Sequence, residues 1–137
     1  MRISEDQKKQ MASLLKRHPL TAAYLFGSQA NGATGPLSDV DIALLFPRAF
    51  KRHDREAIST RIFNEVTTLL GTDELDLVVL ETSPVLLRYD IVTRGQLLFT
   101  KDKEATDRFH FETIQLFEDF RYHIDTRLRL LKQHYAV

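Results

Sequence analysis

The segment from Leu25 to Leu45, LFGSQANGATGPLSDVDIALL, contains two apolar stretches separated by a polar connection that is rich in glycine. The first stretch ends at Gly27-Ser28, and ten residues separate Ser28 from Asp39-Val40-Asp41, which opens the second. Short apolar runs bounded by glycine and proline are typical of buried strands. We therefore predict one strand over 21–26 and another over 38–46.

The second strand carries two carboxylates that share a face. Side chains alternate along a strand, so Asp39 and Asp41 point to one side, while Val40 and Ile42 point to the other. Two carboxylates on one face of an apolar strand repel each other and lose hydration unless a cation lies between them. Oxygen-only ligands suit Mg²⁺, which takes its remaining ligands from water and substrate phosphates. The pattern predicts a magnesium site.

Gly27 and Ser28 provide a second half of the same site. A strand that ends at Gly-Ser and turns into a helix presents backbone N–H groups and a hydroxyl, which together can hold a phosphate. Glycine also lets the backbone approach the ligand closely. A metal-binding strand beside a phosphate-binding turn predicts a nucleoside triphosphate site.

Asp76 is the candidate third carboxylate, because it opens the apolar segment LDLVVL at 75–80. If this strand neighbours the 38–46 strand, Asp76 meets Asp39 and Asp41 at one end of the sheet. Three carboxylates can hold two Mg²⁺ ions about 3.5–4 Å apart. A purely structural role for Asp76, at the start of a strand or as a partner of a helix cap, stays open at this point.

The rest of the chain predicts an α/β fold of the α+β type, with a small mixed sheet flanked by helices. Ser4 and Gln7 have the spacing of a capping box, and helical periodicity recurs between about 53 and 70. Ser83-Pro84 resembles an N-cap followed by proline at the first helical position. The expected order is helix 4–17, strands 21–26 and 38–46, helix 53–70, strand 75–80, helix 84–94, edge strand 96–100 and a long helix 103–133.

The long C-terminal helix contains neither glycine nor proline over 103–133. Apolar residues step along it by threes and fours, from Phe117 through Phe120, Ile124, Leu128 and Leu131 to Tyr135. The simplest interpretation places this stripe in the core. A helix of about 30 residues spans about 45 Å, however, which exceeds what so small a domain needs. Part of the stripe could instead dock on a partner helix and form an oligomer.

Composition limits the classes of function. The 137 residues fit a single domain (1–137), and 19 basic residues balance 19 acidic ones, which argues against a protein that coats nucleic acid or membrane. The absence of cysteine excludes thiolate metal sites and thiol nucleophiles. Apolar runs are too short for a spanning helix, so we expect a cytoplasmic protein. The basic run Arg48, Lys51, Arg52 and Arg55 could reach a triphosphate, although a solvated loop is the favoured interpretation.

The motif in this sequence is Gly27-Ser28 followed, after ten residues, by Asp39-Val40-Asp41. It resembles the signature of the polymerase-β-type nucleotidyltransferases. The short chain resembles the minimal nucleotidyltransferase (MNT) branch, and within it the MntA-type antitoxins that are encoded beside a HEPN-domain toxin, HepT. The resemblance implies that Asp39, Asp41 and Asp76 bind metal, that Asp76 also serves as base or orients the acceptor, and that Gly27 and Ser28 hold the β- and γ-phosphates. Many relatives have Ala-Arg-Gly after Gly-Ser, where this chain has Ala30-Asn31-Gly32.

The activity implied by the resemblance is attack of a hydroxyl on the α-phosphate of ATP, with Mg²⁺ as cofactor and pyrophosphate as product. The implied acceptor is a tyrosine of HepT, which is silenced as a ribonuclease once it carries AMP. Two alternatives stay open: a stand-alone nucleotidyltransferase that modifies a small molecule, and a non-catalytic antitoxin that inhibits by binding. We expect no direct binding of nucleic acid, because the chain lacks a basic groove of convincing size.

Overall fold

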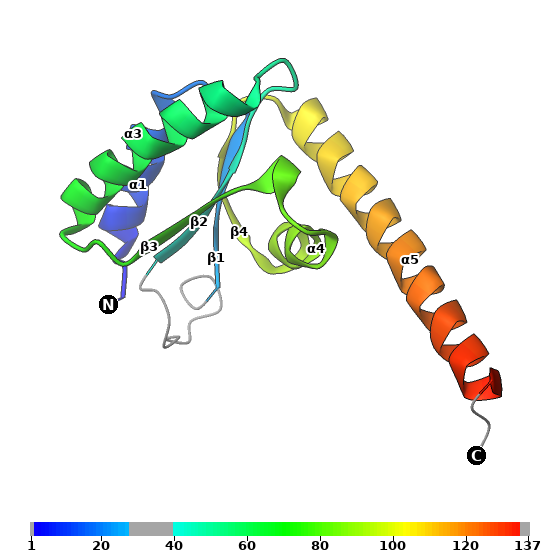
Figure 1. The fold of residues 1–137 in the computed structure, drawn as a ribbon. Coiled ribbons are helices and arrows are strands. Elements are labelled where there is room, and N and C mark those ends of the chain that lie inside the picture. Colours follow the sequence, from blue (N-terminus) through cyan, green and yellow to red (C-terminus); the bar gives the residue numbers. More distant parts are fainter. Residues whose placement is uncertain (1, 28–39, 135–137) are drawn as a thin grey trace.

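The computed structural model describes residues 2–27 and 40–134 (Figure 1). The elements follow the predicted order of helices and strands. They are α1 (Glu5–Lys16), β1 (Ala22–Phe26), β2 (Val40–Leu45), α3 (Arg52–Leu70), β3 (Leu75–Val79), the short 3₁₀ helix η1 (Leu80–Thr82), α4 (Val85–Arg94), β4 (Gln96–Thr100) and α5 (Lys103–His134).

The four strands of the described residues form one mixed sheet in the order β3-β2-β1-β4. β2 runs antiparallel to β1 and parallel to β3, and β4 pairs antiparallel with the other edge of β1. Helices α1 and α3 cover one face, whereas α4 and the first half of α5 cover the other (Figure 1). The predicted fold class, including the edge position of the 96–100 strand, is confirmed.

Strand alternation divides the core into two layers. Val40, Ile42 and Leu44 of β2 are fully buried against the residues of α1 and α3. Ala43 and Leu45 pack on the opposite face, with the residues of α4 and α5. Because both faces are covered, β2 is apolar along almost its whole length, and Asp41 is the exception among its described residues.

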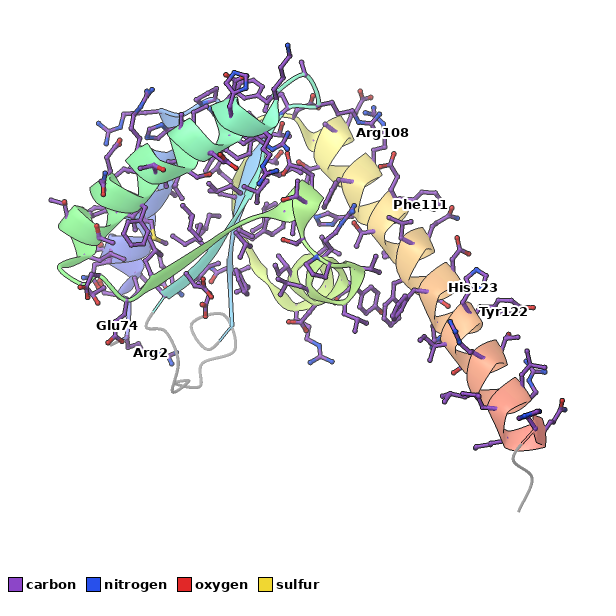
Figure 2. All side chains as sticks on the ribbon, in the orientation of Figure 1. Arg2, Glu74, Arg108, Phe111, Tyr122 and His123 are labelled. Carbon is purple, nitrogen blue, oxygen red and sulfur yellow. The ribbon has the colours of Figure 1, made fainter. Side chains whose placement is uncertain are left out.

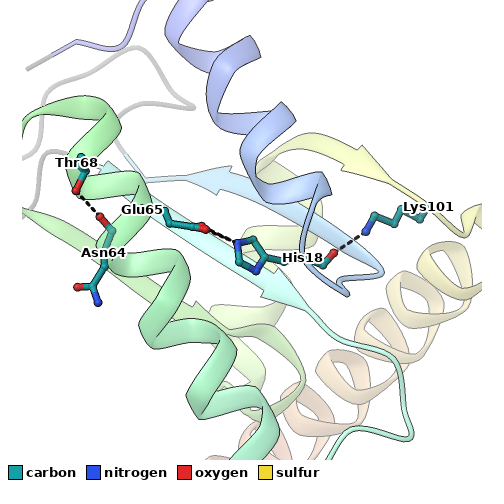
Figure 3. A network of polar contacts seen from close by, with 5 residues as sticks. All are labelled: His18, Asn64, Glu65, Thr68 and Lys101. Atoms are coloured by element: carbon teal, nitrogen blue, oxygen red, sulfur yellow. Dashed lines mark hydrogen bonds and ion pairs between the residues drawn. The ribbon is translucent and has the colours of Figure 1, made fainter.

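Local signals set several of the boundaries. The capping box of α1 is present: Gln7 N–H donates to Ser4 Oγ at 3.1 Å, and Ser4 N–H donates to Gln7 Oε1 at 2.9 Å. α3 ends at Gly71, which adopts the left-handed conformation with φ 71°. Beyond α1, His18 ties the connection to β1 to its surroundings (Figure 3): its ring contacts Glu65 of α3 at 2.9 Å, and its carbonyl accepts from Lys101 Nζ at 2.6 Å.

Two local predictions were wrong. Ser83 is not the N-cap of α4, because Pro84 occupies that position and the Ser83 hydroxyl donates back to the carbonyl of Val79 at 2.8 Å. The stripe on α5 is not core beyond Phe117, since Phe120 and the described apolar residues after it are exposed. The helix extends past the sheet and α4, which leaves nothing in the described chain to cover it (Figure 1). Tyr135 lies outside the described residues.

None of the helices in the described part of the chain combines the length and the apolar composition that a bilayer-spanning segment requires. The longest, α5, has sufficient length but carries charged side chains throughout.

Candidate active site

Asp41 and Asp76 lie on adjacent strands as register partners of the parallel β2–β3 ladder. Neighbouring strands are about 4.8 Å apart, so the backbone positions that carry the two carboxylates are close to each other. Side chains two residues apart on a strand lie on the same face of the sheet. Asp41 therefore shares a face with Ala43, and Asp76 shares a face with Val78, and this is the face that packs on α4 and α5. Asp41 is half-buried and Asp76 is exposed. The condition for Asp76 to meet Asp41, that their strands are neighbours, is therefore fulfilled, whereas Asp39, the other carboxylate of the expected group, lies outside the described residues.

Gly27 completes this end of the sheet, because it follows Phe26, the register partner of Asp41 in the β1–β2 ladder. Its φ of 69° is in the left-handed region, which side-chain-bearing residues avoid. A Cβ atom at this position would overlap Asp41 Oδ2 and lie 3.2 Å from Asp41 Cγ. The backbone of Gly27 therefore occupies space directly against the Asp41 carboxylate that only glycine leaves available.

Two of the predicted site residues, Ser28 and Asp39, lie outside the described residues. No group of three or more potential metal-ligating side chains occurs within residues 2–27 and 40–134. Asp41 and Asp76 form a pair there. Two acceptor-only carboxylates on one face of neighbouring strands, with the glycine backbone closing the third side, fit a hard divalent cation such as Mg²⁺.

The basic run after β2 lies at the other end of the sheet from this pair. Asp41 and Phe46 are five residues apart, which corresponds to about 16 Å along a strand. Arg48 Nη2 contacts Glu112 at 2.9 Å, Arg52 Nε contacts Glu56 at 2.9 Å, and Arg55 Nη1 donates to the carbonyl of Phe50 at 2.8 Å. These contacts agree with the favoured interpretation of a solvated loop and helix start.

A half-buried carboxylate also lies at that far end. Glu81 Oε2 accepts the backbone N–H of Phe46 at 3.0 Å, which ties η1 to the end of β2. Burial raises the pKa of Glu81, although two backbone hydrogen bonds and the nearby Arg55 and Arg88 act in the opposite direction. This group therefore contributes to the fold rather than to the site around Asp41.

The structure also brings one polar residue to this end of the sheet that the sequence pattern did not indicate. Gln96, the first residue of β4, is the register partner of Leu25, two residues before Gly27, and its side chain is exposed. The local sequence predicts that 96–100 is an edge strand, but it contains no signal for which strand it pairs with. Only the assembled sheet places Gln96 at the end that carries Gly27.

Solved structures with the same fold include chains from toxin–antitoxin complexes. One from a crystal structure of MntA–HepT matches with TM-score 0.67 and 21% identity over 97% of this chain and 100% of that one. One from a toxin–antitoxin crystal structure with AMP-PNP matches with TM-score 0.68 and 23% identity over 96% and 99%. A third, from the tri-AMPylated Shewanella oneidensis HEPN toxin in complex with MNT antitoxin, matches with TM-score 0.68 and 20% identity over 98% and 100%.

These similarities show a shared fold over nearly the whole chain. A search of the curated proteins gave no significant match. The sequence itself supplies the family: residues 9–104, which include every predicted site residue, match the family model for "Polymerase beta, Nucleotidyltransferase". The chain belongs to this nucleotidyltransferase family.

Proposed function

We propose that the protein, as a single minimal domain over residues 1–137, is an antitoxin that transfers AMP from ATP to a tyrosine hydroxyl of a HEPN-type ribonuclease toxin such as HepT. The observation that carries the proposal is the Asp41–Asp76 pair beside the backbone of Gly27, in a chain of the nucleotidyltransferase family. The solved structures of the same fold supply the acceptor class, because one contains an AMPylated HEPN toxin.

In this reaction the tyrosine oxygen forms a bond to the α-phosphorus of ATP. The bond from that phosphorus to the oxygen that bridges to the β-phosphate breaks, and pyrophosphate leaves. The tyrosine proton passes to Asp76 or to water, and Asp76 is the carboxylate that we assign as base or as the group that orients the acceptor. In-line positioning of the two reactants supplies much of the rate in transfers of this kind.

The carboxylates Asp39, Asp41 and Asp76 are the residues that we assign to Mg²⁺, two ions in the fully loaded site. The bound metal would neutralise phosphate charge and make the acceptor hydroxyl more acidic. Gly27 and Ser28 are assigned to the β- and γ-phosphates, since a tight turn without a Cβ lets backbone N–H groups approach the phosphate oxygens. ATP is supported as the substrate by the related structure with AMP-PNP, an ATP analogue.

The test is intact-protein mass spectrometry of the product of the neighbouring gene, which the proposal expects to be a HEPN toxin, after incubation with the protein, ATP and Mg²⁺. We expect mass increments of whole AMP units that vanish with EDTA and return with excess Mg²⁺. The Asp41→Asn variant should leave the toxin unmodified while still folding.

The other outcomes distinguish the alternative functions. Pyrophosphate release with small hydroxyl compounds but no toxin modification would indicate a stand-alone enzyme. An Asp41→Asn variant that neutralises the toxin in cells as well as the wild type does would indicate an antitoxin that acts by binding alone.

A further inference from the structure

The two halves of α5 differ in their surroundings. In the first half, Thr106 and Thr113 are buried, and the Phe117 ring stacks on Tyr89 of α4 with ring centroids 3.7 Å apart and planes at 10°. Beyond Phe117 no residue up to His134 is buried, and the helix extends away from the sheet alone (Figure 1). The second half is therefore an exposed helix of about five turns.

The exposed half still carries an apolar stripe, which we define as Phe117, Phe120, Ile124, Leu128 and Leu131. The last four have exposed fractions of 39%, 42%, 51% and 47%, respectively. At 3.6 residues per turn the stripe continues the side of α5 that contacts α4 in the first half. Phe111 and Tyr122 lie on the other side and point away from the domain (Figure 2). The stripe is therefore an extension of a packing face.

The spacing of the stripe is symmetric about Ile124. Successive members are three, four, four and three residues apart, so the pattern is the same in both directions along the helix. When two such helices lie antiparallel and centred on Ile124, Phe117 comes level with Leu131 of the second copy, Phe120 with its Leu128, and Ile124 with its Ile124. An antiparallel copy of the same chain thus matches every apolar residue of the stripe with another.

Four charges on one flank of the stripe follow the same symmetry. Glu118, Arg121, Asp125 and Lys132 all fall on one flank of it, within about 120° of Ile124 at 100° per residue. In the antiparallel arrangement, Glu118 lies about 3 Å along the axis from Lys132 of the second copy, and Arg121 lies about 3 Å from its Asp125. Both pairs are opposite in sign. Within one chain Arg121 also contacts Glu118 at 3.0 Å. Along the helix, the four charges alternate between negative and positive.

We infer that two copies of this chain associate through a symmetric antiparallel pair of α5 helices, with the stripe as the seam and Ile124 on the two-fold axis. Self-complementarity of both the apolar and the charged pattern is what points to a second copy, since a different partner would place no symmetry on the sequence. Leu86, one turn before Tyr89 on α4 and 56% exposed, extends the apolar surface that the end of the second helix would meet.

A helix pair of about five turns is small compared with standard protein interfaces, so we expect a dimer whose population depends on concentration. Sedimentation velocity of the full chain over a wide range of concentrations should show a reversible monomer–dimer equilibrium. A wild-type chain that stays monomeric at every concentration, up to several hundred micromolar, would overturn the inference.

Charge reversal tests the pairing. Glu118→Lys places a positive charge beside Lys132 of the second copy, and Lys132→Glu places a negative charge beside its Glu118. Because like charges then repel each other, each single variant should weaken dimerisation at least about tenfold. The double variant Glu118→Lys/Lys132→Glu restores opposite signs and should recover the dimer. Asp119→Lys, which makes the same charge change one residue along and on the outer side of the helix, is the matched control and should leave dimerisation unchanged. A double variant as weak as the singles would contradict the pairing.

The natural chain contains no cysteine, which allows a second test by cross-linking. Ile124→Cys places two thiols at the two-fold axis, so mild oxidation should give a covalent dimer. Tyr122→Cys, on the outer side of the helix, should give little. Cross-linking of Tyr122→Cys to the same extent would indicate random collision and overturn the inference.

The same variants separate a second copy from the toxin as the occupant of the stripe. If Glu118→Lys weakens binding to the HEPN toxin while the wild-type chain alone is monomeric, the stripe is a toxin-docking surface and the inference is wrong. AMP transfer to the toxin is measured in parallel for the same α5 variants, all of which retain Asp41. The dimer can therefore fail while the proposed activity stands, and the reverse also holds.

Discussion

Asp41 and Asp76 lie opposite each other in the parallel β2–β3 ladder, on the face of the sheet that carries α4. Like charges on directly adjacent strands are destabilising, and one of these two carboxylates is half-buried. Such a pair persists when a ligand that binds the folded state compensates for the repulsion. The relationship therefore predicts opposite effects of neutral substitutions on stability and on activity.

Asp41→Asn and Asp76→Asn should each lower the rate of AMP transfer by at least about a hundredfold, because each removes a proposed metal ligand. In the absence of metal, Asp76→Asn should leave the free energy of unfolding unchanged or raise it, because it relieves the repulsion between the two like charges. Pyrophosphate release and urea denaturation in EDTA measure the two effects.

Asp73→Asn is the control for this pair, since Asp73 is an exposed carboxylate three residues before Asp76. It should change neither the transfer rate nor the stability. Full activity of Asp41→Asn would remove this carboxylate from the reaction, and with it the proposed site.

Gly27→Ala should lower both stability and activity. A residue with a Cβ at φ 69° costs about 1–2 kcal/mol, and the new methyl group would also displace the Asp41 carboxylate. Gly71→Ala is a matched control, because Gly71 has φ 71° and nothing within 4 Å of the position of its Cβ. Both variants should show the backbone cost in urea denaturation, and only Gly27→Ala should lose transfer activity. Equal activity of the two would contradict the role of Gly27 beside Asp41.

His110 should make the fold sensitive to acid. Its Nε2 contacts the hydroxyl of buried Tyr24 at 2.5 Å, and burial lowers the pKa of His110 in spite of nearby Asp107, which raises it. The unfolded chain, with an ordinary histidine pKa of about 6.5, then binds a proton more readily than the folded one. The contribution of His110 to stability is therefore present above pH 6.5 and is lost as pH falls through the lower pKa of the folded state.

The variant His110→Gln retains a polar partner for Tyr24 but does not titrate. The difference between wild type and variant in the free energy of unfolding, measured between pH 7.5 and 5.5, isolates His110 from Glu81, whose raised pKa acts in the opposite direction as pH falls. We expect the wild type to lose more stability than the variant over this range. Parallel pH curves would show that His110 has the same proton affinity in both states.

The fold could be predicted from the sequence because the local signals agree with one another. The Ser4–Gln7 capping box, the Gly71 stop and the alternation of β2 each appear in the structure, and the parity of Asp41 placed it on the correct face. The pairing of β2 with β3, which places Asp41 opposite Asp76, is a contact between distant parts of the sequence. The sequence alone therefore predicts that these carboxylates meet only if the two strands are neighbours.

What could not be predicted depends on long-range arrangement. The periodicity of α5 indicates an apolar stripe, but it does not indicate what covers that stripe, and the α5 residues after Phe117 extend beyond the sheet and α4. Likewise, Ser83 has the residue type of an N-cap, yet its hydroxyl bonds to Val79 and leaves Pro84 to cap α4. Gln96 lies near Gly27 only because β4 pairs with β1.

Phe117 and Phe120, one turn apart on α5, mark the boundary between the packed and the exposed half of that helix. Phe117→Ala removes the ring stack on Tyr89 and should lower the free energy of unfolding by about 1–3 kcal/mol. Phe120→Ala removes the same side chain from a surface that the monomer does not cover, so its effect should stay within about 0.5 kcal/mol. The measurement is urea denaturation at low micromolar protein, where the expected helix pair is dissociated. Equal losses for the two variants would mean that the second half of α5 packs against the domain in solution, and the stripe would then not be available to a second copy.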